Sequence, residues 1–82
     1  MSAIKSIKTI QDYGGITLSL DKMLLTKNIS RNKLAKLIDA RFEVVDRFYT
    51  GKLVRLDLEI LAKICYVLDC NVSDLMSYCS PE

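Results

Sequence analysis

The residues of this chain whose types could support chemistry are mainly basic, and they cluster in its middle. Between Lys27 and Arg55 there are eight lysines and arginines against three acidic residues, whereas the whole chain of 82 residues carries a formal net charge of +2. Such a local concentration of positive charge is typical of a surface that binds phosphates, although an ordinary solvated helix face has the same composition.

Other kinds of chemistry find little support in the residue types. The chain has no histidine and no glycine-rich phosphate loop, and its three cysteines (Cys65, Cys70 and Cys79) include no CxxC pair. It also lacks paired acids spaced for general acid and base work. We therefore expect no enzyme activity, no metal site, no cofactor and no small-molecule substrate, and we expect the cysteines to be free thiols.

Two predicted helices and the turn between them position the basic residues. Residues 30–51 have apolar positions at helical spacing on both sides of a break at Asp39. These positions are Leu34, Ala35, Ile38, Val45 and Phe48. Ser30 suits the N-cap of the first helix, and Gly51 suits the left-handed position that ends the second. Two short helices joined by three or four residues predict a helix-turn-helix.

The outward face of the second of these helices carries candidate base-reading groups. The guanidinium of Arg47 matches the two hydrogen-bond acceptors of guanine. Phe42 could contact a thymine methyl group; the alternative is that it packs at the edge of the hydrophobic core. Glu43 and Asp46 could accept hydrogen bonds from cytosine or could orient Arg47. This face therefore predicts contact with base edges in a major groove.

Candidate phosphate contacts lie on either side of that helix. Arg31 and Asn32 stand in the first turn after Ser30, where free backbone N–H groups attract anions; the alternative is that Arg31 points to water. Lys52 and Arg55 lie in the loop that follows Gly51. The complete set of candidate phosphate contacts is Ser30, Arg31, Asn32, Thr50, Lys52 and Arg55.

The flanking segments predict supporting elements. The pair Gly14-Gly15 suggests a hinge between a mobile arm at 1–15, which could alternatively touch DNA, and a domain at 16–82. The run Ile16 to Leu18 is β-prone and could pair with an edge near the C-terminus. Further helices are expected after Ser19, after Asp57 with Leu58, Leu61, Ile64, Cys65 and Leu68 on its apolar face, and near the end with Ser73 as its cap.

Size and hydropathy limit the remaining possibilities. Half of the residues are hydrophobic, and no apolar run is long enough to cross a bilayer or to form a secretory signal. We therefore expect an all-α, compact bundle of about five short helices, with a short N-terminal β-strand as an open alternative, located in the cytoplasm. A surplus of apolar residues near the C-terminus suggests a self-association surface: Tyr66, Val72, Met76 and Tyr78.

The segment ISRNKLAKLIDARFEVVDRFYTGK, followed by LDLEILAKICYVLDCNVSDLMSY, resembles the Cro and lambda-repressor (XRE) helix-turn-helix family. The resemblance covers about residues 16–78 and is carried by Leu34-Ala35, Val45, Gly51 and Leu68-Asp69-Cys70. Two positions depart from the family: Asp39 replaces the turn glycine, and Arg41 replaces a Ser or Thr cap. The resemblance implies a lambda-repressor-like fold.

The resemblance also implies a function. It makes the chain a sequence-specific DNA-binding transcriptional regulator, a repressor that binds a pseudo-palindromic operator in double-stranded DNA as a homodimer, with a recognition helix at residues 41–50. Base readers then map to Arg41, Phe42, Glu43 and Arg47, and phosphate contacts to Arg31, Lys52 and Arg55. The alternative is a protein-interaction module or antitoxin-like adaptor on the same fold, since Glu43 and Asp46 repel phosphates.

Overall fold

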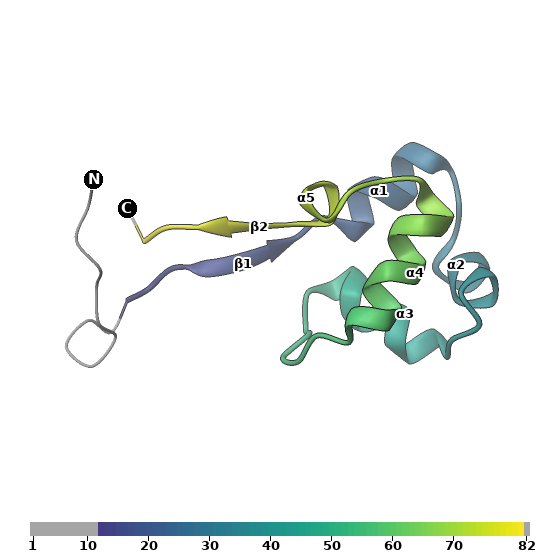
Figure 1. Cartoon of the computed structure of the whole chain (residues 1–82), viewed down its shortest axis with the longest axis horizontal. Coiled ribbons are helices and arrows are strands. Elements are labelled where there is room, and N and C mark those ends of the chain that lie inside the picture. The colour runs from purple at the N-terminus through teal and green to yellow at the C-terminus, as the bar shows by residue number, and fades with distance from the viewer. Residues whose placement is uncertain (1–11, 82) are drawn as a thin grey trace.

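The computed structural model describes residues 12–81, in which five helices form a bundle and two strands form a ribbon (Figure 1). The helices are α1 (Leu20–Lys27), α2 (Arg31–Leu37), α3 (Phe42–Thr50), α4 (Leu58–Leu68) and α5 (Val72–Leu75). The strands are β1 (Gly15–Leu18) and β2 (Met76–Cys79). This arrangement confirms the predicted helical fold and its short N-terminal strand. No helix in the described part of the chain is long and apolar enough to cross a membrane.

Local capping explains several of the helix ends, although the Ser19 side chain makes no capping hydrogen bond at the start of α1. The Ser30 hydroxyl accepts a hydrogen bond from the Lys33 N–H at 3.0 Å, and the Asp57 carboxylate accepts from the Glu59 N–H at 2.9 Å. α1 ends at Asn28, which has a φ of 58°. The predicted roles of Ser30, Asp57 and Asn28 are thereby confirmed.

The start of α5 corrects one prediction. Its N-cap is Asn71, not Ser73, which lies inside the helix. The Asp74 carboxylate accepts a hydrogen bond from the Asn71 N–H at 2.9 Å. An acid three positions after Asn71 therefore completes a reciprocal capping arrangement that Ser73 would not have had.

The core lies where α2, α3 and α4 meet α1 and α5. Its buried side chains are Leu20, Leu24, Leu34, Ala35, Ile38, Val45, Phe48, Leu61, Ile64, Leu68 and Leu75. The five apolar positions predicted for the helix-turn-helix are all among them. Leu58, which the apolar pattern placed on the inner face of α4, is instead 70% exposed, at the first position of that helix.

The ribbon joins the two ends of the described chain and projects from the helical bundle (Figure 1). β1 pairs antiparallel with β2, with Ile16 opposite Tyr78 and Leu18 opposite Met76. The pairing of Ile16 to Leu18 with a C-terminal edge is thus confirmed. At the base of the ribbon, the Ser19 N–H donates to the Leu75 carbonyl oxygen at 2.7 Å, which anchors it to α5.

The outer end of the ribbon includes residues just before β1. The Tyr78 hydroxyl donates to the Tyr13 carbonyl oxygen at 2.7 Å. Gly14 has a φ of +80°, and a Cβ at this position would lie 2.1 Å from the Cys79 carbonyl oxygen, so only glycine fits there. Of the arm predicted for residues 1–15, residues 1–11 lie outside the described part of the chain, and the predicted domain boundary stays a prediction.

Candidate nucleic-acid interface

The turn between α2 and α3 sets how these two helices cross. Asp39 adopts a φ of 55°, the left-handed conformation that its short polar side chain tolerates. The Ala40 N–H then donates to the Ala35 carbonyl oxygen at 2.9 Å and closes the end of α2. Asp39 therefore replaces a turn glycine without loss of the helix-turn-helix geometry.

α3 has one buried face and one free face. Val45 and Phe48 are 0% and 3% exposed, whereas Glu43 and Arg47 are exposed and Phe42 is 37% exposed. The Arg41 backbone is extended at the start of the helix, and its side chain makes no capping hydrogen bond. The Arg41 carbonyl oxygen accepts a hydrogen bond from the Val44 N–H at 3.1 Å, but the Arg41 side chain offers no acceptor to the N–H groups of this first turn.

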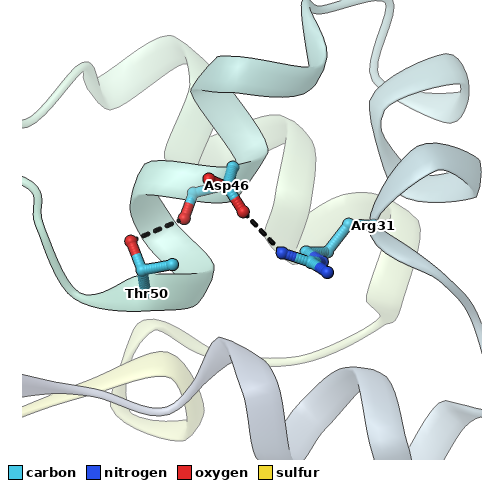
Figure 2. Close-up of polar contacts among 3 residues, drawn as sticks. All are labelled: Arg31, Asp46 and Thr50. Atoms are coloured by element: carbon cyan, nitrogen blue, oxygen red, sulfur yellow. Dashed lines mark hydrogen bonds and ion pairs between the residues drawn. The ribbon is translucent and has the colours of Figure 1, made fainter.

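A cluster of side chains joins the start of α2 to α3. The Arg31 guanidinium forms an ion pair with Asp46, with 2.6 Å between Nη1 and Oδ1 (Figure 2). Its central carbon lies 4.4 Å from the centre of the Tyr49 ring and 5.5 Å from that of Phe42. The Thr50 hydroxyl donates to the Asp46 carbonyl oxygen at 2.9 Å, so Thr50 also belongs to this region of α3. We call Arg31, Phe42, Asp46 and Tyr49 the Arg31 cluster.

The residue pattern allowed two interpretations of Arg31, a side chain that points to water or one that is free to bind a phosphate. The structure shows neither, because the side chain is paired with Asp46. Asp46 contacts Arg31 and not Arg47, the partner considered for it. The side chains of Arg31 and Asp46 are 40% and 36% exposed, so solvent screens the pair, and it contributes only about 0.2–1 kcal/mol. Stacking on Tyr49 adds a similar amount, about 0.5–1 kcal/mol.

A second group of cations gathers at the other end of α3. Arg47, Lys52 and Arg55 border one shallow surface depression with Leu53 and Val54, with a volume of about 260 Å³. Gly51, with a φ of 78°, ends α3 and turns the chain into this loop. Among residues 12–81, none of the three cations forms an ion pair. The structure therefore brings one predicted base reader together with two predicted phosphate contacts.

The remaining candidates stay apart from these two groups. Ser30 accepts from Lys33 but keeps its own O–H, which can still donate to an anion. Asn32, Arg41 and Glu43 are exposed, and no side-chain hydrogen bond or ion pair is found for them within the described part of the chain. These positions remain accessible to a ligand on the outer side of α2 and α3.

The family model of the Cro/C1-type HTH DNA-binding domain matches residues 19–80, which include all five helices and β2. The chain belongs to this family. No curated protein matches it. Membership of the Cro/C1-type family identifies α2 and α3 as the helix-turn-helix of a DNA-binding protein and confirms the resemblance seen in the residues.

One member of the Arg31 cluster of this Cro/C1-type domain was missed from the residue pattern. Tyr49 follows Asp46 by three residues, and Phe42 precedes Asp46 by four, so all three lie along one stripe of α3. This stripe faces the start of α2, where Arg31 stands. The spacing of Phe42, Asp46 and Tyr49 could therefore have indicated a site for a cation from a neighbouring helix.

The ion pair of the Arg31 cluster should be measurable as a coupling energy. In a double-mutant cycle with Arg31→Gln and Asp46→Asn, we expect a coupling free energy of about 0.2–1 kcal/mol that falls as salt is added. Urea denaturation at low and high salt measures it. Glu43→Gln, which removes an exposed acid from the same helix, should show no coupling to Arg31→Gln. Zero coupling between Arg31 and Asp46 at low salt would contradict the contact.

The cysteines of this Cro/C1-type domain are free: Cys65 and Cys70 are half-buried and Cys79 is exposed. Burial raises the pKa of the Cys70 thiol, with a smaller contribution from Cys65, so less of it is thiolate near neutral pH. Within residues 12–81, no group of three or more Cys, Asp or Glu side chains is placed to hold a metal ion. This geometry gives the cysteines no role at the candidate interface.

Alkylation should follow this difference between the thiols. With iodoacetamide at mildly alkaline pH, we expect Cys79 to react several times faster than Cys70, because Cys79 is exposed while the Cys70 thiol is half-buried with a raised pKa. Peptide mass spectrometry over time measures the two rates. Unfolding the protein in urea should bring the rates together. Faster reaction at Cys70 in the folded protein would show that the description of its surroundings is wrong.

Proposed function

We propose that this protein is a sequence-specific transcriptional regulator, a repressor, that places α3 in the major groove of double-stranded DNA. The observation that carries the proposal is the grouping of Arg47, Lys52 and Arg55 beside the exposed face of α3. In protein–DNA complexes, contacts to base edges specify the sequence, while contacts to phosphates position the protein. The Arg47 guanidinium is suited to the first kind of contact, and the two neighbouring cations at the end of α3 are suited to the second. The Cro/C1-type family supports the proposal in general terms.

Each side chain has a proposed role in this complex. Arg47 donates two hydrogen bonds to the acceptor edge of guanine, while Arg41, Phe42 and Glu43 contact bases near the start of α3. Lys52 and Arg55 bind phosphates on one side, and Ser30 and Asn32 bind them on the other, with Thr50 at the edge of the groove.

The Arg31 cluster leads us to revise one role. Because the Asp46 carboxylate contacts Arg31, we propose that Asp46 contributes by orienting that guanidinium toward a phosphate at the start of α2, and not by accepting from cytosine. The donors of Arg31 that do not contact Asp46 are sufficient for a phosphate, since guanidinium carries five N–H groups.

The protein would act as a homodimer in the cytoplasm. Two copies of α3 would meet two half-sites about one helical turn apart, so the operator would be pseudo-palindromic. Blocking that site would make the regulator a repressor. Three free thiols fit a reducing compartment such as the cytoplasm.

Selection from a random pool of duplex oligonucleotides tests the proposal. After repeated rounds, we expect the bound sequences to contain an inverted repeat with half-site centres about 10 base pairs apart. Guanine should be enriched at one position in each half-site, opposite Arg47. Recovery of sequences with no shared motif, or no retention of DNA at low salt, would contradict the proposal.

The second candidate function is a protein-interaction module, and one observation favours it. Phe42 is 37% exposed beside the exposed acid Glu43, which gives the start of α3 an apolar and acidic surface unlike that of a simple phosphate binder. A pull-down at moderate salt separates the two functions. One stoichiometric protein partner that is lost in Phe42→Ala, with no DNA retained, would favour this module over the DNA-binding regulator.

A further inference from the structure

The β1–β2 ribbon has two chemically different faces. Residues directly opposite one another in an antiparallel pair share a face, so Ile16 and Tyr78 lie with Leu18 and Met76 on one side. The other side holds only small or polar residues, including Thr17, whose hydroxyl lies 3.2 Å from the Cys79 sulfur. The ribbon is therefore apolar on one face only.

The apolar face of the ribbon continues into a groove. Ile16, Leu18 and Met76 line it from the ribbon, and the loop between α3 and α4 lines it from the other side with Leu53, Val54, Arg55 and Leu56. The groove has a volume of about 300 Å³. Its inner end is covered, since Leu18 and Met76 are half-buried, but at its outer end Ile16 is 63% and Val54 94% exposed.

The exposed apolar residues at the outer end of the groove could be buried by association with another surface. A two-stranded ribbon is only marginally stable by itself in water, and this one projects from the bundle (Figure 1). Tyr78 is 62% exposed, yet its hydroxyl donates a hydrogen bond to the Tyr13 carbonyl oxygen. A fixed aromatic ring can bury apolar area on association at little cost in side-chain entropy.

We propose that this surface, the ribbon face together with the groove, is where a second copy of the chain binds, so that the outer end of each ribbon packs against the groove of the other. The inference rests on the proposed function in one respect, because a pseudo-palindromic operator needs a two-fold dimer. The groove begins beside Gly51, where α3 ends, and Arg47 is not among the residues that line it, so a second copy bound there would leave Arg47 uncovered.

The charge of the ribbon and the apolar area that a dimer would bury are both consistent with a second copy of the chain in the groove. Residues 15–18 and 76–79 carry no charge in a chain with a strongly basic middle, so the ribbon of one copy can approach the groove of the other without like-charge repulsion. Arg55 is the one charged residue among those lining the groove in the described part of the chain. Covering Ile16, Val54, Leu56 and Tyr78 in both copies would bury on the order of 1,000 Å² in total, near the lower limit for a specific interface.

Sedimentation equilibrium without DNA, under reducing conditions and up to about 100 μM protein, tests this interface. We expect a dimer for the wild type and at least about tenfold weaker dimerisation for Ile16→Glu and for Val54→Glu. Val54 lies in a loop and is 94% exposed, so Val54→Glu should fold even if Ile16→Glu does not. The new carboxylate would lie beside Arg55, which offsets its charge, so the loss would come from placing a charged group in an apolar contact and not from repulsion between like charges.

Two matched controls make the result specific. Thr17→Glu adds the same charge to the same strand on the opposite face, and Tyr66→Glu replaces an aromatic residue on α4 that is 88% exposed. Both should dimerise within about twofold of the wild type. A monomeric wild type, a dimer unaffected by Val54→Glu, or a dimer lost equally in Thr17→Glu would overturn the inference.

The test also separates this inference from the proposed function. A dimer that needs Val54 but retains no DNA would support the interface and contradict the DNA-binding role. A monomer that selects a single half-site from a random pool would support the DNA-binding role and contradict the interface.

Discussion

Replacing Arg47 with alanine is expected to weaken binding to the selected operator by about 5- to 150-fold while leaving binding to unrelated duplexes nearly unchanged. The range corresponds to the 1–3 kcal/mol of discrimination that one bidentate contact to guanine supplies. Arg47 is exposed on α3, so its removal should not unfold the protein. Fluorescence anisotropy with the selected duplex and a scrambled one of equal length measures both affinities.

Lys52→Ala is the matched control for Arg47→Ala, because it removes a neighbouring cation that borders the same depression. It should weaken binding to both duplexes by a similar factor and reduce the dependence of log K on log salt by about one. If Arg47→Ala also weakened both duplexes equally, then Arg47 would bind phosphate and α3 would not read sequence through it.

Replacing Phe48 with alanine should have the largest effect on folding. Phe48 is 3% exposed on the inner face of α3, and truncating a buried phenylalanine costs about 3–5 kcal/mol through lost burial and the cavity left behind. Such a loss approaches the whole stability of a domain of this size, so a large part of the protein should be unfolded at 37 °C. Urea denaturation followed by circular dichroism measures it.

Phe42→Ala provides the comparison for Phe48→Ala within one helix. Phe42 is 37% exposed and contacts Arg31 only at 5.5 Å, so its loss should cost about 1 kcal/mol or less. Equal destabilisation by the two substitutions would mean that Phe42, and not only Phe48, belongs to the core.

The parts of the fold that depend on local chemistry were predictable from the residues. Ser30 and Asp57 cap helices with their own side chains, and Asn28 and Gly51 take left-handed conformations at helix ends. Each of these capping interactions involves residues at most four positions apart, so the helix ends can be predicted from the local sequence alone. The pairing of Ile16 to Leu18 with the C-terminal edge was also predictable, because so short a β-prone run needs a partner strand.

The parts that depend on contacts between elements were not predictable. Arg31 and Asp46 are 15 positions apart, and their pairing follows from the angle at which α2 meets α3. The contact between Arg31 and the Tyr49 ring likewise depends on how α2 and α3 pack in the folded chain. Leu58 has the periodicity of a core residue, but its burial depends on what covers the first turn of α4, which periodicity does not show.

The most direct test of the DNA-binding account is to locate the surface that contacts DNA. In NMR titrations of this 9.3 kDa chain with the selected duplex, backbone and side-chain signals report which residues change environment. We expect the largest shifts at Arg31 and at residues 41–55, with small shifts at Tyr66 on the outer side of α4. Shifts centred on Tyr66 and α4, or no shifts at low salt, would contradict the account.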